Sequence, residues 1–162
     1  MRAIALAAAL ALSAGAAAYA QPSDVQVAIG PKLMEKAQDE YGVRDVQRLA
    51  DDLRADVQRE LTRTGALSGA RIELTLVDAK PNRPTFKQLG DKPGLSYQSF
   101  GLGGAAIEGR AIGADGVVTP LSYSWYESDI RQAWATTTWS DANDAINRFA
   151  RRVAKGQTLA SR

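Results

Sequence analysis

The sequence contains no cysteine and no histidine, and these two absences exclude several classes of function. Without cysteine there can be no disulfide framework, no thiolate metal site, no cysteine nucleophile and no lipid attached through an N-terminal cysteine. Without histidine there can be no histidine general base, no Ser-His-Asp triad and no histidine-ligated metal. The acidic residues also lack the D-x-D-x-D-G spacing of a calcium loop. We therefore expect no metal site and no cofactor, and the sequence favours a protein that is not an enzyme.

An excess of charge of one sign is also missing. Lys and Arg total 20 against 18 Asp and Glu, so the formal net charge is only +2. Acidic and basic residues alternate along the chain, whereas nucleic-acid binding requires Lys and Arg clustered on one face. We therefore predict that nucleic acid is not a partner.

The first twenty residues have the pattern of a secretory signal peptide. Arg2 supplies the positive charge, an apolar stretch follows from Ala3 to Leu12, and Ala18-Tyr19-Ala20 matches the small-x-small cleavage pattern. The apolar stretch is too short and too rich in alanine to span a bilayer, which needs about 20 apolar residues. We predict cleavage after Ala20, no membrane span in the mature chain, and a soluble protein over 21–162 in the periplasm or outside the cell.

Apolar residues at steps of three and four predict an amphipathic helix that ends at Gly65, where a left-handed cap is required. Its apolar stripe consists of Val43, Val46, Leu49, Ala50, Leu53, Val57 and Leu61. Its solvent face is predicted to carry acid–base pairs three residues apart, namely Asp45–Arg48, Asp51–Arg54, Asp56–Arg59 and Glu60–Arg63.

A second helix is predicted near the C-terminus, with Ser140 as its N-cap and Gly156 as its stop. Asp141 and Asp144 lie in its first turn, where the helix dipole favours negative charge. Its apolar stripe consists of Ala142, Ala145, Ile146, Phe149 and Val153. The same dipole explains the basic residues near its end, which are Arg148, Arg151, Arg152 and Lys155.

Alternating apolar residues predict four strands. The first contains Val25, Val27 and Ile29 and precedes a short helix from Pro31 toward Tyr41; the second contains Ile72, Leu74 and Leu76. The third covers 105–112, and a tight turn at 113–116 pairs it with the fourth as an antiparallel hairpin. The inward row of the fourth strand is predicted to be Val117, Thr119, Leu121, Tyr123 and Trp125, and Pro120 places this strand at an edge.

The predicted order is therefore β-(α)-α-β-β-β-α. Helices at both ends of a short, mainly antiparallel sheet can bury their apolar stripes against one sheet face. We predict an α+β fold with a single two-layer domain over 21–162.

The long segment 79–104 combines prolines and glycines with large apolar residues. Connections of this length are uncommon in compact domains and are usually functional or disordered. Since a disordered linker would not carry so many apolar side chains, we predict an ordered loop over the sheet edge, with a turn of helix at 85–89. We expect its aromatic residues to form a satellite core, and a ligand-stacking surface is the alternative.

Two shorter motifs have a chemical interpretation. Residues 101–106 match the G-x-G-x-x-A dinucleotide pattern, but they precede a strand, so we expect these glycines to allow close packing or a bend. In 125–131, Glu127 and Asp129 could act as acid and base on a glycosidic bond, with Trp125, Trp134 and Trp139 stacking on sugars. The alternative is a loop held by Asp and Glu capping and by an Arg131 ion pair, with the tryptophans in the seam between helix and sheet.

Two stretches carry a resemblance to known families: Pro81-Asn82-Arg83-Pro84-Thr85-Phe86 through Gly103-Gly104-Ala105, and Trp125-Tyr126-Glu127-Ser128-Asp129-Ile130 through Arg148-Phe149-Ala150. They resemble exported proteobacterial proteins of unknown-function families, which often include lipoproteins. The order of elements is also similar to small envelope domains such as the amino-terminal domain of the Tol translocation protein. The resemblance implies a small α/β envelope domain.

We expect a non-enzymatic domain that binds a protein or another component of the cell envelope. The contact surface is predicted to lie at 83–100 and 125–131, and its binding residues are Arg83, Phe86, Tyr97, Phe100, Trp125, Tyr126 and Arg131. An exposed edge strand could also recruit a partner by strand addition. The alternative function is a carboxylate-dependent hydrolase of a polysaccharide, with Glu127 and Asp129 as its catalytic residues.

Overall fold

The computed structural model describes residues 23–157, except for the side chains of residues 134 and 135. The predicted signal peptide at 1–20 lies outside the described residues. In chain order the elements are β1 (Asp24–Ile29), α1 (Pro31–Lys36), a π-helical segment (Ala37–Tyr41), α2 (Val43–Thr64), β2 (Arg71–Lys80), α3 (Phe86–Asp91), β3 (Gly104–Ile112), β4 (Val118–Tyr126), a 3-10 helix (Ile130–Ala135) and α4 (Ser140–Ala154).

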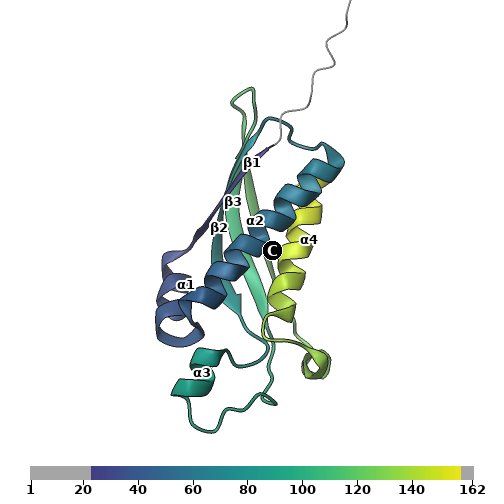
Figure 1. The fold of residues 1–162 in the computed structure, drawn as a ribbon. Helices are drawn as coiled ribbons and strands as arrows, with labels where there is room; N and C mark the ends of the chain where they lie inside the picture. The colour runs from purple at the N-terminus through teal and green to yellow at the C-terminus, as the bar shows by residue number, and fades with distance from the viewer. Residues whose placement is uncertain (1–22, 158–162) are drawn as a thin grey trace, which may run out of the picture.

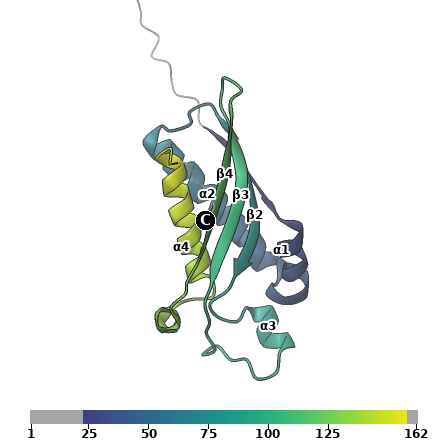
Figure 2. The same cartoon turned by 180° about the vertical axis from the view of Figure 1, so that it is seen from behind.

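The four strands form one sheet in the order β1-β2-β3-β4. β1 is parallel to β2, whereas β2–β3 and β3–β4 are antiparallel pairs. The two long helices, α2 and α4, lie side by side across one face of this sheet (Figure 1). Figure 2 shows the opposite face of the sheet in front of them. The α+β fold and the strand order are as predicted.

The core lies between the sheet and the stripes of α2 and α4. Apolar residues of both helices and of the inward rows of β2 and β3 are buried in it, including Leu53, Phe149, Ile72 and Ile107. Val43 is exposed, so its predicted place in the α2 stripe is wrong. It is the first residue of α2 and lies one turn before the residues that face the sheet.

The C-terminal cap of α2 and most of the ion pairs on its solvent face are as predicted from the sequence. Gly65 adopts a left-handed conformation with φ of 71°, and its N–H donates to the carbonyl of Leu61 at 2.8 Å. Among the described residues, ion pairs join three of the four predicted acid–base pairs: Asp51–Arg54, Asp56–Arg59 and Glu60–Arg63. Asp45 and Arg48 instead line a cleft, described below.

The hairpin between β3 and β4 forms as predicted. The N–H of Gly113 donates to the carbonyl of Val117, and β4, which contains Pro120, is an edge strand. Leu121 and Tyr123 are buried, but Val117 and Thr119 are exposed, so the predicted inward row is too long at its start. The reason is that the tip of the hairpin extends beyond the end of α4 (Figure 2).

α4 begins at Ser140, so the prediction that Ser140 is the N-cap is wrong. The Oγ of Ser140 accepts from the N–H of Thr137 at 2.8 Å, and the N-cap residue is Trp139, whose side chain makes no capping hydrogen bond. The first turn is capped from a distance, because the N–H of Asp141 donates to Oδ1 of Asn82 at 2.9 Å. Gly156 ends the helix with φ of 64°, as predicted. Over residues 23–157, the helices are too short or too polar to cross a membrane.

Candidate functional site

The two limbs of the loop between β2 and β3 are joined by a buried polar cluster. Asn82 and Asp141 are both buried, and the side-chain amide of Asn82 donates to the carboxylate of Asp141. The same carboxylate accepts from the N–H of Gly103 at 2.9 Å, and the N–H of Asn82 donates to the carbonyl of Thr138. Since buried polar groups are costly unless they are paired, this cluster fixes both ends of the loop to the start of α4.

Arg83, a predicted binding residue, holds the loop together. Its Nε donates to the carbonyl of Thr136, and its Nη1 donates to the carbonyl of Tyr97 at 3.0 Å. The guanidinium therefore bridges the segment before α4 and the far limb of the loop. We assign Arg83 a positioning role at this site.

The short helix α3 is fixed by a capping box. The Oγ1 of Thr85 accepts from the N–H of Gln88 at 3.2 Å, and Oε1 of Gln88 accepts from the N–H of Thr85 at 3.1 Å. Lys92 pairs with Glu40 of the π-helical segment at 3.3 Å. This anchoring sets the direction of Phe86, the first residue of α3.

The aromatic side chains of this loop are exposed. Phe86 is 78% exposed and Tyr97 is 68% exposed, and their rings meet edge to face with centroids 6.3 Å apart. Leu95 and Phe100 are also exposed. The prediction of a satellite core is therefore wrong, because buried hydrogen bonds rather than packed aromatic rings hold the loop. The loop also lies beyond the end of the sheet, below α1 in Figure 1, and not over its edge.

Two clefts open beside these aromatic residues. The first has a volume of about 190 Å³ and is lined by Phe86, Tyr97, Asp45, Arg48 and Trp139, among others. The second has a volume of about 220 Å³ and includes Leu95 and Phe100 in its lining. Arg83 and Pro84 line both clefts and so separate them. We call this end of the molecule, formed by residues 83–100 and the two clefts, the loop end.

Of the glycines at 101–104, Gly103 and Gly104 allow close packing, as predicted, whereas a Cβ on Gly101 would meet nothing within 4 Å. A Cβ on Gly103 would lie 2.6 Å from Oδ1 of Asn82 and 2.8 Å from the carbonyl oxygen of Lys80. A Cβ on Gly104 would collide with the backbone of Trp125. The motif leads into β3 and not into a helix, so it lacks the geometry of a dinucleotide site.

The carboxylates of Glu127 and Asp129 are engaged within their own loop. Oε1 of Glu127 accepts from the N–H groups of Ser128 and Asp129 at 2.7 and 2.9 Å. Asp129 pairs with Arg131 at 2.7 Å, and this hydrogen-bonded ion pair lowers the pKa of Asp129 and raises that of Arg131. The predicted capping and ion pair in this loop are confirmed.

Trp125 and Tyr126 point to opposite faces of the sheet. The guanidinium carbon of Arg148 lies 4.1 Å from the ring centre of Trp125, in the seam between α4 and β4. The hydroxyl of Tyr126 donates to Asp78 at 2.7 Å on the other face, and Asp78 also pairs with Lys36 at 2.8 Å. Trp139 packs against Tyr41 with ring centres 5.8 Å apart, and the side chain of Trp134 lies outside the described residues.

These contacts shift three pKa values. Burial would raise the pKa of Asp78, but the hydrogen bonds from Lys36 and Tyr126 outweigh it, so the pKa lies below its usual value. The hydrogen bond to Asp78 raises the pKa of Lys36. Burial and the hydrogen bond to Asp78 raise the pKa of Tyr126 well above its usual range. The cluster is therefore a structural link between α1 and β4.

The structure brings together only part of the predicted contact surface. Phe86, Tyr97 and Phe100 belong to the loop end, whereas Trp125, Tyr126 and Arg131 do not line its clefts. Sequence analysis missed the pairing of Asn82 with Asp141, which are 59 residues apart, and the place of Asp45 and Arg48 in a cleft. Trp139, which was named only as a sugar-stacking residue of the alternative hydrolase, lines the same cleft. The only sequence feature that singled out Asp141 was its place in the acidic first turn of a predicted helix. That feature was explained by the helix dipole and gave no indication of a partner such as Asn82.

The comparisons with known proteins assign no family. No family model matches the chain. No curated protein matches it either.

Proposed function

We propose that the protein is a non-enzymatic binding domain of the periplasm or cell exterior, and that its loop end binds a protein or another component of the cell envelope. The observation that carries this proposal is the exposure of Phe86 and Tyr97 on a loop fixed by buried hydrogen bonds. Neighbouring exposed aromatic side chains are typical of binding surfaces. The signal-peptide pattern at 1–20 and the resemblance to exported proteobacterial proteins support the location.

Fixing the loop in advance favours binding. Ordering a flexible loop on association costs free energy, and a loop that is already held by Asn82 and Arg83 avoids most of this cost. The aromatic rings would supply the apolar centre of the interface, while Asp45 and Arg48 would supply its polar rim. A partner protein with a protruding apolar side chain surrounded by charged residues would complement this arrangement.

The alternative, a polysaccharide hydrolase, needs two carboxylates that face a substrate across a cleft. Glu127 and Asp129 accept hydrogen bonds from their own loop and do not line the clefts of the loop end. We therefore favour binding over hydrolysis. Glu127→Gln leaves any binding activity unchanged in this proposal, whereas a hydrolase would lose its turnover.

Cross-linking capture tests the proposal. The tagged mature protein is cross-linked in periplasmic and membrane fractions, and captured proteins are identified by mass spectrometry. We expect one reproducible partner, and we expect Phe86→Ala with Tyr97→Ala to lose it while the protein keeps its melting temperature. Ile130→Ala removes an exposed apolar group that lines neither cleft and serves as the control. Equal capture by all three proteins would refute the loop end as the binding surface.

A further inference from the structure

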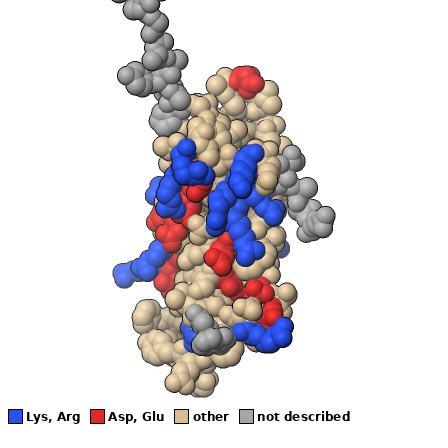
Figure 3. Space-filling view, turned by 90° about the vertical axis from the view of Figure 1, so that its right-hand side faces the viewer, with Lys and Arg blue, Asp and Glu red and all other residues tan. Residues whose placement is uncertain are grey.

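Basic side chains from two helices gather on one side of the molecule. Although acidic and basic residues alternate in the sequence, the fold brings the last turns of α2 beside the second half of α4. The exposed basic residues there are Arg59, Arg63, Arg148, Arg151, Arg152 and Lys155. Figure 3 shows basic side chains as two blue groups in the upper part of this face, with red acidic side chains between and below them. We call these six residues the arginine face.

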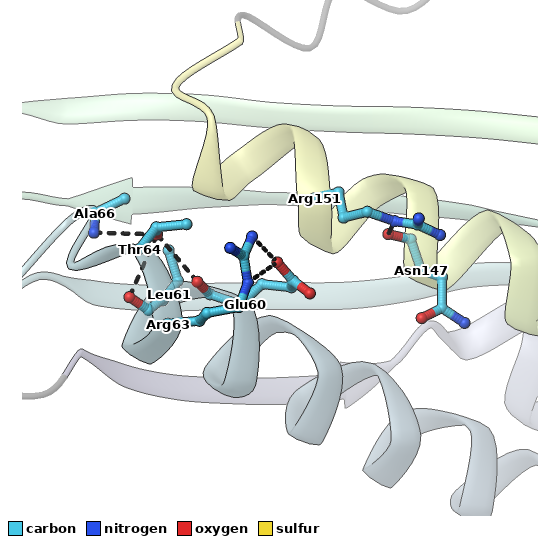
Figure 4. Close-up of polar contacts among 7 residues, drawn as sticks. All are labelled: Glu60, Leu61, Arg63, Thr64, Ala66, Asn147 and Arg151. Atoms are coloured by element: carbon cyan, nitrogen blue, oxygen red, sulfur yellow. Dashed lines mark hydrogen bonds and ion pairs between the residues drawn. The ribbon is translucent and has the colours of Figure 1, made fainter.

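The acidic partners in this region lie beneath the guanidinium groups. The side chain of Arg63 is 62% exposed and that of its partner Glu60 is 20% exposed. The side chain of Arg59 is 61% exposed and that of its partner Asp56 is 16% exposed. In Figure 4, Glu60 is held by Arg63 on α2 while Arg151 extends from α4 on the other side. The outer layer of this face is therefore positive even though it contains ion pairs.

The basic residues of α4 offer donors to an anion, although Nε of Arg151 already donates to the carbonyl of Asn147 at 3.2 Å (Figure 4). Among the described residues, no Asp or Glu forms an ion pair with Arg148, Arg151, Arg152 or Lys155. The guanidinium groups of Arg148 and Arg152 stack on the rings of Trp125 and Tyr123, 4.1 and 5.0 Å from the ring centres. Stacking leaves the in-plane N–H groups of a guanidinium free, and these match the oxygens of a phosphate.

Exposed apolar residues adjoin the arginine face at the same end of the molecule. Val117, just before β4, and Val118, its first residue, are 59% and 55% exposed, and Leu67 is exposed in the turn after α2. This hairpin, the turn and the C-terminal end of α4 all lie at the end opposite α3 (Figure 1). Asp115 is the acidic residue of the hairpin turn, where its carboxylate accepts from the N–H of Val117 at 3.0 Å.

We propose that the arginine face, with Leu67, Val117 and Val118, binds a bilayer surface that contains anionic phospholipid. The guanidinium and ammonium groups contact lipid phosphates, and the apolar side chains enter the headgroup region. The apolar residues favour a lipid surface over a soluble polyanion, which would gain nothing from them. In this arrangement the loop end points away from the bilayer, where a partner can reach it.

Vesicle sedimentation tests the proposal with the mature protein purified from bacteria that export it. We expect binding to vesicles with phosphatidylglycerol, weaker binding as salt rises, and none to pure phosphatidylcholine. Each basic residue near a membrane contributes a factor of about five, so Arg151→Gln with Lys155→Gln should weaken binding about 25-fold. Lys32→Gln with Lys87→Gln makes the same charge change on α1 and α3 and should leave binding unchanged.

A second pair of variants separates lipid from a soluble polyanion. Val117→Ser with Val118→Ser should weaken vesicle binding and leave any binding of inorganic polyphosphate unchanged. Absence of binding to phosphatidylglycerol vesicles at low salt would overturn the proposal. Tight binding of polyphosphate, with vesicle binding insensitive to both valines, would also overturn it in favour of a soluble polyanion. Phe86→Ala with Tyr97→Ala should keep full vesicle binding. Failure of partner binding at the loop end is therefore distinguishable from failure of lipid binding at the arginine face.

Discussion

The loop end and the arginine face place their polar groups in opposite ways. At the loop end, polar groups are buried at the base and aromatic rings are exposed. On the arginine face, the apolar stripes of α2 and α4 are buried, carboxylates lie in the middle layer and cations are outermost. In both regions the buried groups, which are the polar cluster of the loop end and the apolar stripes of the helices, stabilise the fold. The exposed aromatic rings and cations contribute little to stability. The comparison shows that the outermost side chains of each region are those available for binding.

The largest effect is expected from the base of the loop end. Asn82→Ala removes the amide that pairs with the buried Asp141 carboxylate, and it should lower the free energy of unfolding by about 2–4 kcal/mol. Urea denaturation measures the change. Gln98→Ala, an exposed amide in the same loop, is the control and should cost less than about 0.5 kcal/mol. Equal effects of the two variants would contradict the role of the buried cluster.

A smaller loss is expected at Gly103. An alanine there would place its Cβ against Asn82 and the backbone of Lys80, and such overpacking should cost about 1–3 kcal/mol. Gly101→Ala is the matched control, because nothing lies within 4 Å of the added Cβ. Thermal denaturation compares the two variants. A melting temperature for Gly103→Ala equal to that of Gly101→Ala would show that the loop limbs are not held closely.

The link between Asp78, Lys36 and Tyr126 should contribute about 1 kcal/mol or less, since these groups are partly exposed. The pKa of Asp78 is lower in the folded protein, so its contribution is present above the unfolded value of about 4 and is lost as pH falls through the folded value. The pKa values of Lys36 and Tyr126 are raised, so their contributions are present below about pH 10 and are lost as pH rises through the folded values.

Asp78→Asn tests this dependence. The difference in unfolding free energy between wild type and variant should be constant near neutral pH and should shrink on acidification below about pH 4. Denaturation at a series of pH values measures it. A difference that grows on acidification would have the wrong sign for a lowered pKa.

The smallest effect is expected from the stacking of Arg148 on Trp125. Removing it with Arg148→Ala should cost about 0.5–1 kcal/mol, and a double-mutant cycle with Trp125→Leu isolates the interaction. Arg44→Ala, an exposed arginine of α2, serves as the control. Additive effects in the cycle would show that the guanidinium is not held by the ring.

The sequence predicts the elements whose stabilising contacts are local. The stripes of α2 and α4, the cap at Gly65 and the turn at 113–116 all depend on residues close in the chain, so their patterns indicate them directly. The start of α4 is different, because Asn82 caps it from 59 residues away. Local patterns carry no signal for such a contact, and Ser140 was predicted in its place.

The exposed aromatic residues of the loop end and the positive charge of the arginine face were not predicted from the sequence, and the reasons are related. The apolar composition of 79–104 predicts burial, yet hydrogen bonds of Asn82, Arg83 and Thr85 hold the loop and leave Phe86 and Tyr97 exposed. The alternation of acid and base along α2 predicts a neutral face, yet the carboxylates are covered and the cations of α4 lie beside them. In both regions the burial of each side chain decides whether the surface is aromatic or positively charged. Burial depends on tertiary packing, which local sequence patterns do not show.

The central claim is that the loop end contacts a partner, and site-specific photo-cross-linking in living cells tests it most directly. A photoreactive amino acid replaces Tyr97 in one strain and the exposed Ala55 on α2 in another. We predict a discrete cross-linked adduct from position 97 that disappears when Phe86→Ala is added, and no such adduct from position 55. An adduct of equal yield from position 55, or none from position 97 in cells that produce the protein, would contradict the account.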